Sequence, residues 1–412
     1  MTEARLFWSR TNALLRSEAL NNKWLQGLAI ATAIFAIYWL TAPGGNPYRQ
    51  YVLLADSLLH GRLYIPIVEP RPALELAIYG EKGFVVDPPA PALFLMPFVT
   101  LLGTDVNQVQ ISIGVGAAAM GLFWVATRQM RWDLHVSAAI TLLLALGTNF
   151  WWAATDGALW EFAHVSAVFF LMAALVEATG CRRPWLVGLL VGLAGMSRLP
   201  TFLTFPFFAY LVLDADKRPW RELLRDQGSW LRLVVFGAGL GLMAASYLAY
   251  NYGRFGTIKD LGYYHPYYDA EPHFAHGRFD ISYVPRHITA IFFQPPGLTQ
   301  SDFPFFKPSQ IGLALFFTTP AFLYAFNTYF NRLTLAASAA TLLTLVPLMS
   351  HGTTGWNQFG YRYSMDLFPM LAVLTAAGMR HELTPLKWIV IFLSCLVSLW
   401  GTLAFHKYGW VV

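Results

Sequence analysis

The sequence predicts an all-α protein, a polytopic membrane helix bundle of about eleven spans with amphipathic surface helices in its first outer loop. Three observations predict this fold class. The chain has 412 residues, of which 56% are hydrophobic and only 12% are charged, against about 25% charged in a soluble protein. It contains repeated apolar runs that approach the roughly 20 residues needed to cross a bilayer. Its arginines and lysines recur in every second connecting loop.

The apolar runs are interpreted as helices, because backbone polar groups inside a bilayer must hydrogen-bond within their own segment. The predicted spans are residues 24–41, 109–126, 134–151, 160–177, 184–196, 201–213, 231–250, 309–329, 333–349, 364–379 and 388–404. They form a single transmembrane domain over residues 1–412. The long outer loops 43–106 and 251–307 are expected to form the cap of the presumed active site.

The basic residues also predict orientation. Arg5, Arg10 and Arg16 precede the first span, which lacks a small-residue cleavage site, so we interpret it as an uncleaved anchor with a cytoplasmic N-terminus. The protein is therefore expected to be a multi-pass protein of the plasma (inner) membrane, with its site on the extracytoplasmic face. This topology accounts for the net charge of +5 without a nucleic-acid partner. Cys181 and Cys395 are not expected to form a disulfide.

Two surface elements are predicted in the first long loop. Residues 47–60 form an amphipathic helix with Arg49, Asp56 and His60 on one stripe. Residues 90–102 are too short to span comfortably and are expected to be interfacial or re-entrant. The alternative, a true span, would invert every later loop, and the Arg/Lys distribution argues against it.

Three carboxylates are candidates for catalysis: Asp56, Asp156 and Asp87. A carboxylate near the outer leaflet can serve as a general base. Each also has a structural interpretation. Asp56 fits a solvated helix face, Asp156 fits a helix N-cap, and Asp87 fits a turn before Pro88.

Four arginines on the outer side are candidates for phosphate binding: Arg254, Arg362, Arg198 and Arg62. A guanidinium binds phosphate through two parallel N–H groups and stacks on aromatic rings. The alternative is that an arginine at a helix end only extends to the lipid headgroups.

Further residues are candidates for substrate binding. Glu161 and His164 lie within a predicted span, where ionisable groups usually face the interior. The complete candidate set is His60, Glu161, His164, Tyr263, His265, Trp356 and Tyr361. The loop stretch with Asp269, Glu271, His273 and His276 has ligands for a divalent cation, but His-x-x-His in an irregular loop is not diagnostic. We predict no metal residues and no firm cofactor.

Several motifs together resemble a known family. LADSLLHGRLYIP, DPPAPALFLMPFVTLLG and TDGALWEFAHVSAVFFLMAALVEATG resemble the integral-membrane C-type (GT-C) glycosyltransferases, similar to protein O-mannosyltransferases and lipid A aminoarabinose transferases. NYGRFG and QFGYRY resemble related bacterial membrane proteins of that group. The resemblance covers roughly residues 25–380. The resemblance implies a bundle of membrane helices. It also implies a glycosyl donor in which the sugar is carried on a polyprenyl phosphate and is transferred outside the cytoplasm.

The chain departs from the family at two motifs. Asn46 and Pro47 occupy the place of the family's catalytic Asp-Glu pair, and asparagine cannot act as a base. Asp87–Pro88 occupies the place of a Lys-Pro phosphate contact. Asp156 matches the family's second acidic position. The base therefore falls to Asp56 first, then to Asp156 or Asp87.

The function predicted from the sequence is glycosyl transfer from a polyprenyl-phosphate sugar to a lipid, glycan or protein acceptor of the cell envelope, with inversion by direct displacement. Tyr263, Trp356 and Tyr361 would stack on sugar faces. Asp56→Asn is expected to abolish transfer while expression stays intact. Two alternatives are a transporter or flippase of a lipid-linked sugar, which explains Asn46 better, and a catalytically inactive GT-C-like scaffold.

Overall fold

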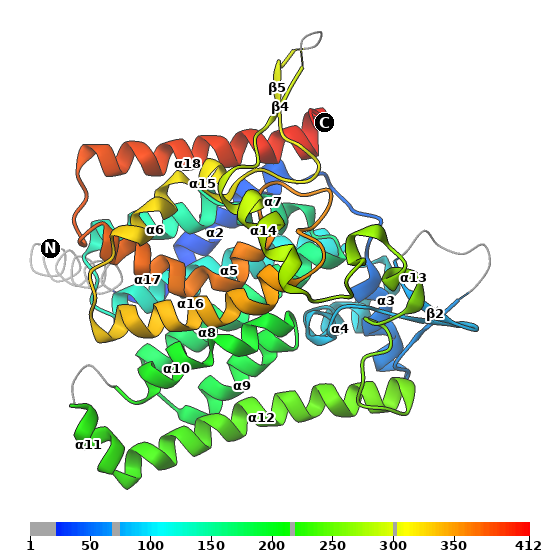
Figure 1. Ribbon diagram of the computed structural model, residues 1–412, viewed down its shortest axis with the longest axis horizontal. Coiled ribbons are helices and arrows are strands. Elements are labelled where there is room, and N and C mark those ends of the chain that lie inside the picture. The colour runs from blue at the N-terminus through cyan, green and yellow to red at the C-terminus, as the bar shows by residue number, and fades with distance from the viewer. Residues whose placement is uncertain (1–21, 68–74, 215–218, 300–302) are drawn as a thin grey trace, which may run out of the picture.

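The computed structural model describes residues 22–67, 75–214, 219–299 and 303–412, and most of them are helical. The basic tail with Arg5, Arg10 and Arg16 lies outside the described residues. The long helices are α2 (Lys23–Thr41), α5 (Gln108–Gln129), α8 (Leu159–Thr179), α12 (Gln227–Phe255), α16 (Arg332–Ser350) and α18 (Pro385–Leu403). They run along the long axis of the molecule (Figure 1), and each is long and apolar enough to cross a membrane.

Shorter elements complete the described part of the chain. The short helices are α3 (Gln50–Leu59), α4 (Ala90–Leu102), α6 (Leu134–Leu146), α7 (Phe150–Asp156), α9 (Pro184–Gly195), α10 (Phe205–Val212), α11 (Trp220–Arg225), α13 (Pro266–Asp269), α14 (Val284–Phe292), α15 (Leu315–Thr318) and α17 (Phe368–Gly378). The tighter or wider turns of helix are η1 (Gly103–Asp105), η2 (Leu199–Thr204), η4 (Pro272–Phe274), η5 (Ile281–Tyr283), η6 (Pro320–Asn327), η7 (Arg362–Leu367) and η8 (Ala404–Tyr408).

Five short strands were not expected from the sequence. Strands β1 (Ile65–Pro66), β2 (Ala77–Tyr79) and β3 (Lys82–Phe84) form an antiparallel sheet in the order β1-β3-β2. Strands β4 (Gly297–Leu298) and β5 (Phe306–Lys307) form a hairpin that projects from the bundle in Figure 1. These strands are too short to change the fold class, which is all-α as predicted.

The expected count of about eleven spans is not confirmed. Six described helices satisfy the length and apolarity of a span, or seven if α6 and α7, which meet at 49°, count as one broken span. Other predicted spans are shorter or interrupted. Residues 309–329 divide into α15 and η6 at Pro320, because proline removes a backbone donor. Residues 201–213 are the turn η2 followed by α10.

Side-chain caps set where several long helices begin. Asn22 accepts a hydrogen bond from the Trp24 amide at 2.9 Å and starts α2. Asn331 and Thr334 form a reciprocal capping box at the start of α16. Asparagine caps of this kind satisfy amide groups that have no partner within the helix.

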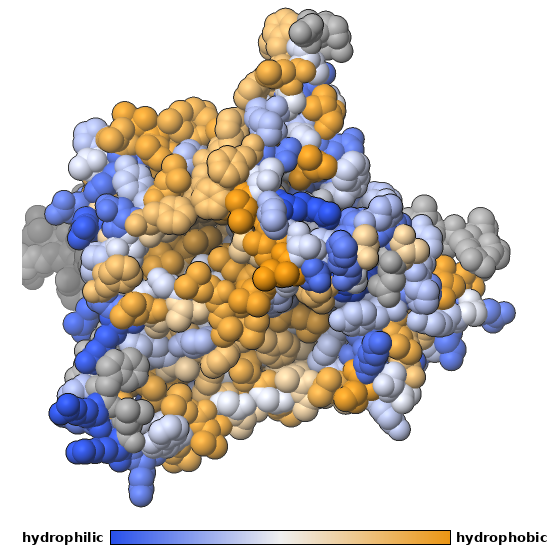
Figure 2. Space-filling model, in the orientation of Figure 1, coloured by the Kyte–Doolittle hydropathy of each residue, from blue (hydrophilic) through white to orange (hydrophobic). Residues whose placement is uncertain are grey.

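Both surface elements predicted in the first loop are helices. The predicted residues 90–102 coincide with α4, and the predicted residues 47–60 contain α3. Helix α3 buries Tyr51 and Leu54, while the side chains of Asp56 and His60, on the predicted polar stripe, are 30% and 61% exposed. The two helices lie with the β1–β3 sheet at one end of the bundle (Figure 1). In the same orientation, Figure 2 shows apolar side chains along the middle of the helices and hydrophilic side chains gathered toward the left and right ends of the bundle.

A face of small residues lets α12 approach α9 closely. A Cβ on Gly239 would lie 2.2 Å from the Trp185 carbonyl oxygen, and a Cβ on Gly188 would lie 2.0 Å from the Phe236 carbonyl oxygen. Both positions therefore require glycine. Gly237, on the same helix, has no atom within 4 Å of its would-be Cβ. Small residues at helix contacts are typical of membrane bundles.

We expect Gly239→Ala to destabilise the protein by about 1–3 kcal/mol, because the new methyl group overpacks the α9–α12 contact. Gly237→Ala is the matched control, and it should leave stability unchanged or raise it by about 0.5–1 kcal/mol because alanine favours helix. Thermal unfolding in one detergent measures both. Equal midpoints for the two variants would contradict the close packing of α12 on α9.

Candidate active site

Two buried pairs join helix α8 to the turn η7. Glu161 Oε1 accepts a hydrogen bond from Arg362 Nη1 at 2.9 Å. One helical turn later, His164 Nδ1 lies 2.9 Å from Asp366 Oδ1. Glu161 and His164 are three residues apart on α8 and therefore share one face of that helix, and Arg362 and Asp366 both lie in η7. His164 and Asp366 have no exposed surface, and Glu161 is 2% exposed.

A third chain segment brings Arg198 to the same place. The backbone of Arg198 is extended, with φ −145°, at the break between α9 and η2. Pro200 follows in the first turn of η2, where its missing backbone N–H leaves no helical hydrogen bond unmade. The break sends Arg198 Nη2 to within 3.4 Å of Asp366 Oδ2. Its guanidinium lies over the Tyr363 ring, 5.3 Å from the centroid.

Both guanidiniums keep an unused edge. Arg362 uses Nη1 for Glu161 and, at 3.4 Å, for the Trp356 carbonyl oxygen. Within the described residues, Nε of Arg362 and Nε of Arg198 are buried without a hydrogen-bond partner. Buried polar groups are normally paired, so unpaired donors suggest that a ligand supplies the acceptors. Phosphate oxygens fit two such forks.

Two carboxyl groups of the first long loop lie within electrostatic reach of these arginines. Burial raises the pKa of Asp87, and the charges of Arg198 and Arg362 oppose that rise. Burial also raises the pKa of Glu75 to about 7; the charge of Asp87 adds to this, and Arg362 and Arg278 oppose it. Asp87 keeps partial solvent accessibility even though the surrounding protein desolvates its carboxyl. In the described part of the chain, Asp87 makes no hydrogen bond or ion pair.

Asp156 ends α7 and accepts a hydrogen bond from Asn46 of the first long loop. Asn46 Nδ2 donates to Asp156 Oδ1 at 3.0 Å, and the Ala158 amide donates to the same oxygen at 3.2 Å. Gly157 follows in the left-handed conformation with φ 60°, and a Cβ there would lie 2.8 Å from Val109 Cα. The chain can therefore turn into α8 only with glycine at this position.

Asp56, His60 and Arg62 form a local cluster at the end of α3. His60 Nδ1 is 3.4 Å from Asp56 Oδ1, and Arg62 Nη2 is 3.5 Å from Asp56 Oδ2. The three side chains are part-exposed. No contact between described residues joins this cluster to Arg198 or Arg362.

Arg254 contacts protein groups with both of its terminal nitrogens, Nη1 and Nη2. Its nitrogens donate to the Val85 carbonyl oxygen at 2.9 Å and to Asn251 Oδ1 at 2.5 Å, and Nη2 lies 3.2 Å from Asp260. This arrangement ties the end of α12 to the first long loop. His265 makes a further contact with that loop, since its Nε2 is 3.3 Å from the Ile78 carbonyl oxygen.

The aromatic candidates occupy different environments. Tyr361 is buried and its hydroxyl lies 2.9 Å from His287 Nδ1. The Tyr263 hydroxyl lies 2.6 Å from His351 Nε2. Trp356 is 64% exposed and contributes its carbonyl oxygen to Arg362. Among the residues that the structure describes, no group of three or more His, Cys, Asp or Glu could hold a metal ion.

Asp366, Glu75 and Arg278 were not predicted from the sequence. Asp366 stands in an otherwise apolar run, four residues after Arg362, and an ionisable group there is the signal that was available. Arg278 lies over the Tyr263 ring, 5.0 Å from its centroid, in the second long loop. No local pattern marks Glu75 or Arg278, because both lie in irregular segments.

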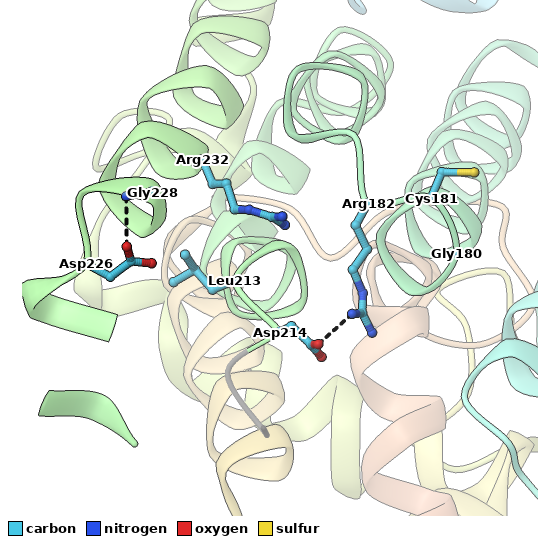
Figure 3. A pocket seen from close by; sticks show the side chains of 8 residues that line it. All are labelled: Gly180, Cys181, Arg182, Leu213, Asp214, Asp226, Gly228 and Arg232. Carbon is cyan, nitrogen blue, oxygen red and sulfur yellow. Dashed lines mark hydrogen bonds and ion pairs between the residues drawn. The ribbon is translucent and has the colours of Figure 1, made fainter. Parts of the chain in front are cut away.

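A separate polar pocket of about 640 Å³ lies at the other end of α8 (Figure 3). It is lined by Gly180, Cys181, Arg182, Leu213, Asp214, Asp226, Gly228 and Arg232. Arg182 Nη1 is 2.7 Å from Asp214 Oδ2 and links the ends of α8 and α10. The pocket shares no residue with the Glu161–Arg362 and His164–Asp366 pairs, so it is not part of the candidate active site.

One solved structure is similar to this chain. It is the crystal structure of ArnT from Cupriavidus metallidurans bound to undecaprenyl phosphate, with a TM-score of 0.52 and 14% sequence identity. The similarity covers 88% of this chain and 61% of ArnT, so the chain spans about three fifths of that protein. No protein-family model and no curated sequence matches the chain. The fold is that of the polytopic GT-C protein ArnT, and the resemblance drawn from the motifs is confirmed at the level of the fold.

Proposed function

We propose that the protein is a membrane glycosyltransferase that moves a sugar from a polyprenyl-phosphate donor to an acceptor hydroxyl at the extracytoplasmic face. The observation that carries the proposal is that Arg198 and Arg362, from separate elements, both lie within electrostatic reach of Asp87 and each have an unpaired Nε among the described residues. The fold it shares with ArnT, which was solved with undecaprenyl phosphate, supports the choice of donor. The protein is inserted in the inner membrane with its N-terminus in the cytoplasm.

In the proposed reaction the acceptor oxygen attacks the anomeric carbon of the sugar. The bond from that carbon to the phosphate oxygen breaks, and its electron pair leaves on the phosphate. Arg198 and Arg362 stabilise the charge that develops there. The acceptor proton passes to a carboxylate. A single displacement of this kind inverts the anomeric centre.

Asp87 is our choice for the base. It lies within reach of both arginines, it has no partner among the described residues, and burial raises its pKa toward the range in which a base works well. Asp156 is second, because Asn46 and Ala158 already use one of its oxygens. Asp56 is third, because its local partners lie at the end of α3.

The proposal is tested by incubating the purified protein with synthetic polyprenyl-phosphate sugars and an envelope lipid extract. We expect release of free polyprenyl phosphate together with a glycosylated product of inverted configuration, both detected by mass spectrometry and NMR. If the protein, reconstituted in liposomes, moves the donor from one leaflet to the other without cleaving it, it is instead a flippase. Failure to bind or cleave any such donor would contradict the proposal.

The pKa of Glu75 predicts a pH effect on donor binding. Glu75 is neutral below pH of about 7 and negative above it, so its ionisation opposes a phosphate at Arg362. The lipid phosphate titrates in the same range. The informative quantity is therefore the ratio of the wild-type to the Glu75→Gln dissociation constant for undecaprenyl phosphate. We expect a ratio near one at pH 6 and of about 3–10 at pH 8. Equal ratios at the two pH values would contradict this role.

The same shift fixes the sign of the effect on stability. The folded-state pKa of about 7 lies above the usual value of 4.5, so the folded protein retains a proton that the unfolded chain releases. The stabilising contribution is complete below pH 4.5 and is lost as pH rises through about 7. Thermal midpoints of wild type and Glu75→Gln should therefore differ more at pH 8 than at pH 5.

A further inference from the structure

Asp366 has a single feature that the proposed function does not use: it holds two side chains at once. One carboxylate oxygen meets His164 Nδ1 at 2.9 Å, and the other meets Arg198 Nη2 at 3.4 Å. Neither His164 nor Asp366 has any exposed surface. The contacts join residues 202 and 168 positions apart, so three separate elements meet at this carboxylate.

The geometry assigns the tautomer of His164. An ionised carboxylate only accepts hydrogen bonds, so Nδ1 of His164 carries the hydrogen atom and donates a hydrogen bond to Asp366. This bond fixes the orientation of the carboxylate plane. With its plane fixed, Asp366 offers its second oxygen to Arg198 in one direction only. Among the described residues, one hydrogen bond, to Asp366, and one ring, that of Tyr363, hold the long and flexible side chain of Arg198.

We propose that Asp366 is a positioning residue, oriented by His164, that aims the free edge of the Arg198 guanidinium at the phosphate of the lipid donor. This rests on the proposed function, because the phosphate is the donor's. Arg362 has a corresponding partner in Glu161. The two arginines thus form two arms of one phosphate clamp, each fixed from behind by a buried carboxylate. Neither Asp366 nor His164 needs to touch the donor.

Charge and orientation predict opposite effects for Asp366→Asn. Removing a negative charge beside Arg198 strengthens the positive field at the clamp, and that alone would tighten the binding of a phosphate. Losing the fixed orientation of the Arg198 guanidinium would weaken the binding of a phosphate. A purely structural role would affect all lipid ligands equally. The sign and the phosphate dependence of the change therefore distinguish positioning from the alternatives.

The experiment measures dissociation constants for undecaprenyl phosphate and for undecaprenol, which lacks the phosphate, with the full chain in lipid nanodiscs. We expect Asp366→Asn to weaken undecaprenyl phosphate binding about tenfold, the effect of one charge-assisted hydrogen bond, and to leave undecaprenol unchanged. His164→Leu keeps the Arg198–Asp366 pair and should weaken phosphate binding about threefold. His164→Asn places an amide N–H near Nδ1 and should restore most of the loss.

Several outcomes would overturn the proposal. Unchanged or tighter undecaprenyl phosphate binding by Asp366→Asn would show that the charge at position 366, and not the orientation of Arg198, governs phosphate binding. Equal losses for phosphate and alcohol would indicate a structural role. If Asp366→Asn does not fold, wild-type affinity of His164→Leu for undecaprenyl phosphate would overturn the proposal in its place. If wild type itself does not bind undecaprenyl phosphate, the proposed function fails together with this inference, whereas the other outcomes leave that function standing.

Discussion

Replacing Arg362 with lysine will lower sugar transfer by about 10²–10³-fold without unfolding the protein. Arg362 gives Nη1 to Glu161 at 2.9 Å and keeps other donors free. A lysine has one ammonium group, and the buried Glu161 carboxylate will hold it. The charge pair survives, so stability is kept, but no fork remains for the phosphate. Donor affinity and turnover, measured beside the thermal midpoint, test this separation.

Arg183→Lys is the matched control. Arg183 makes a two-nitrogen contact with Glu177, at 3.0 and 2.8 Å, at the other end of α8. The chemistry of the substitution is the same, but this pair belongs to no part of the proposed site. Its variant should transfer at the wild-type rate. A loss in Arg183→Lys that equals the loss in Arg362→Lys would show that the effect is general to the helix and not specific to phosphate.

Asp87→Asn will abolish measurable transfer, a loss of about 10²–10⁴-fold, because it removes the proposed base. It will keep or raise the thermal midpoint. Asp87 makes no hydrogen bond or ion pair to any described residue, and burial disfavours its charged form, so a neutral amide is tolerated. Donor binding should remain. An inactive variant that binds undecaprenyl phosphate is the expected result.

Two other aspartates provide the comparison. Asp105 is exposed in η1 of the same loop, and Asp105→Asn should be fully active. Asp56→Asn tests the base that the sequence placed first against Asp87. If Asp56→Asn is inactive while Asp87→Asn transfers normally, the base lies on α3, and the role proposed for Asp87 is wrong.

Local patterns predicted the elements of this fold well. The apolar run after Pro88 and Pro89 gave α4 with the same bounds, since prolines start a helix and its apolar composition sustains it. The span count was less successful. An apolar run such as residues 309–329 looks the same whether it is one helix or two short ones divided at a proline.

The candidate site could be predicted only in part from the sequence, because its contacts join residues far apart in the chain. Glu161, His164, Arg198 and Arg362 could be singled out, since ionisable groups in or beside apolar runs are unusual. Their pairing could not be predicted, because Glu161 and Arg362 are 201 positions apart. For the same reason no local pattern reveals Asp366 as the shared partner of His164 and Arg198. The packing of η7 on both α8 and η2 brings them together.

The central claim is that Arg198 and Arg362 bind one phosphate group, and a structure of the protein with undecaprenyl phosphate in a nanodisc tests it most directly. We predict phosphate density within hydrogen-bonding distance of both guanidiniums, on the edges that carry their unpaired Nε atoms. Phosphate density elsewhere, for example at Arg182 in the pocket at the other end of α8, with both guanidinium edges empty, would contradict the account.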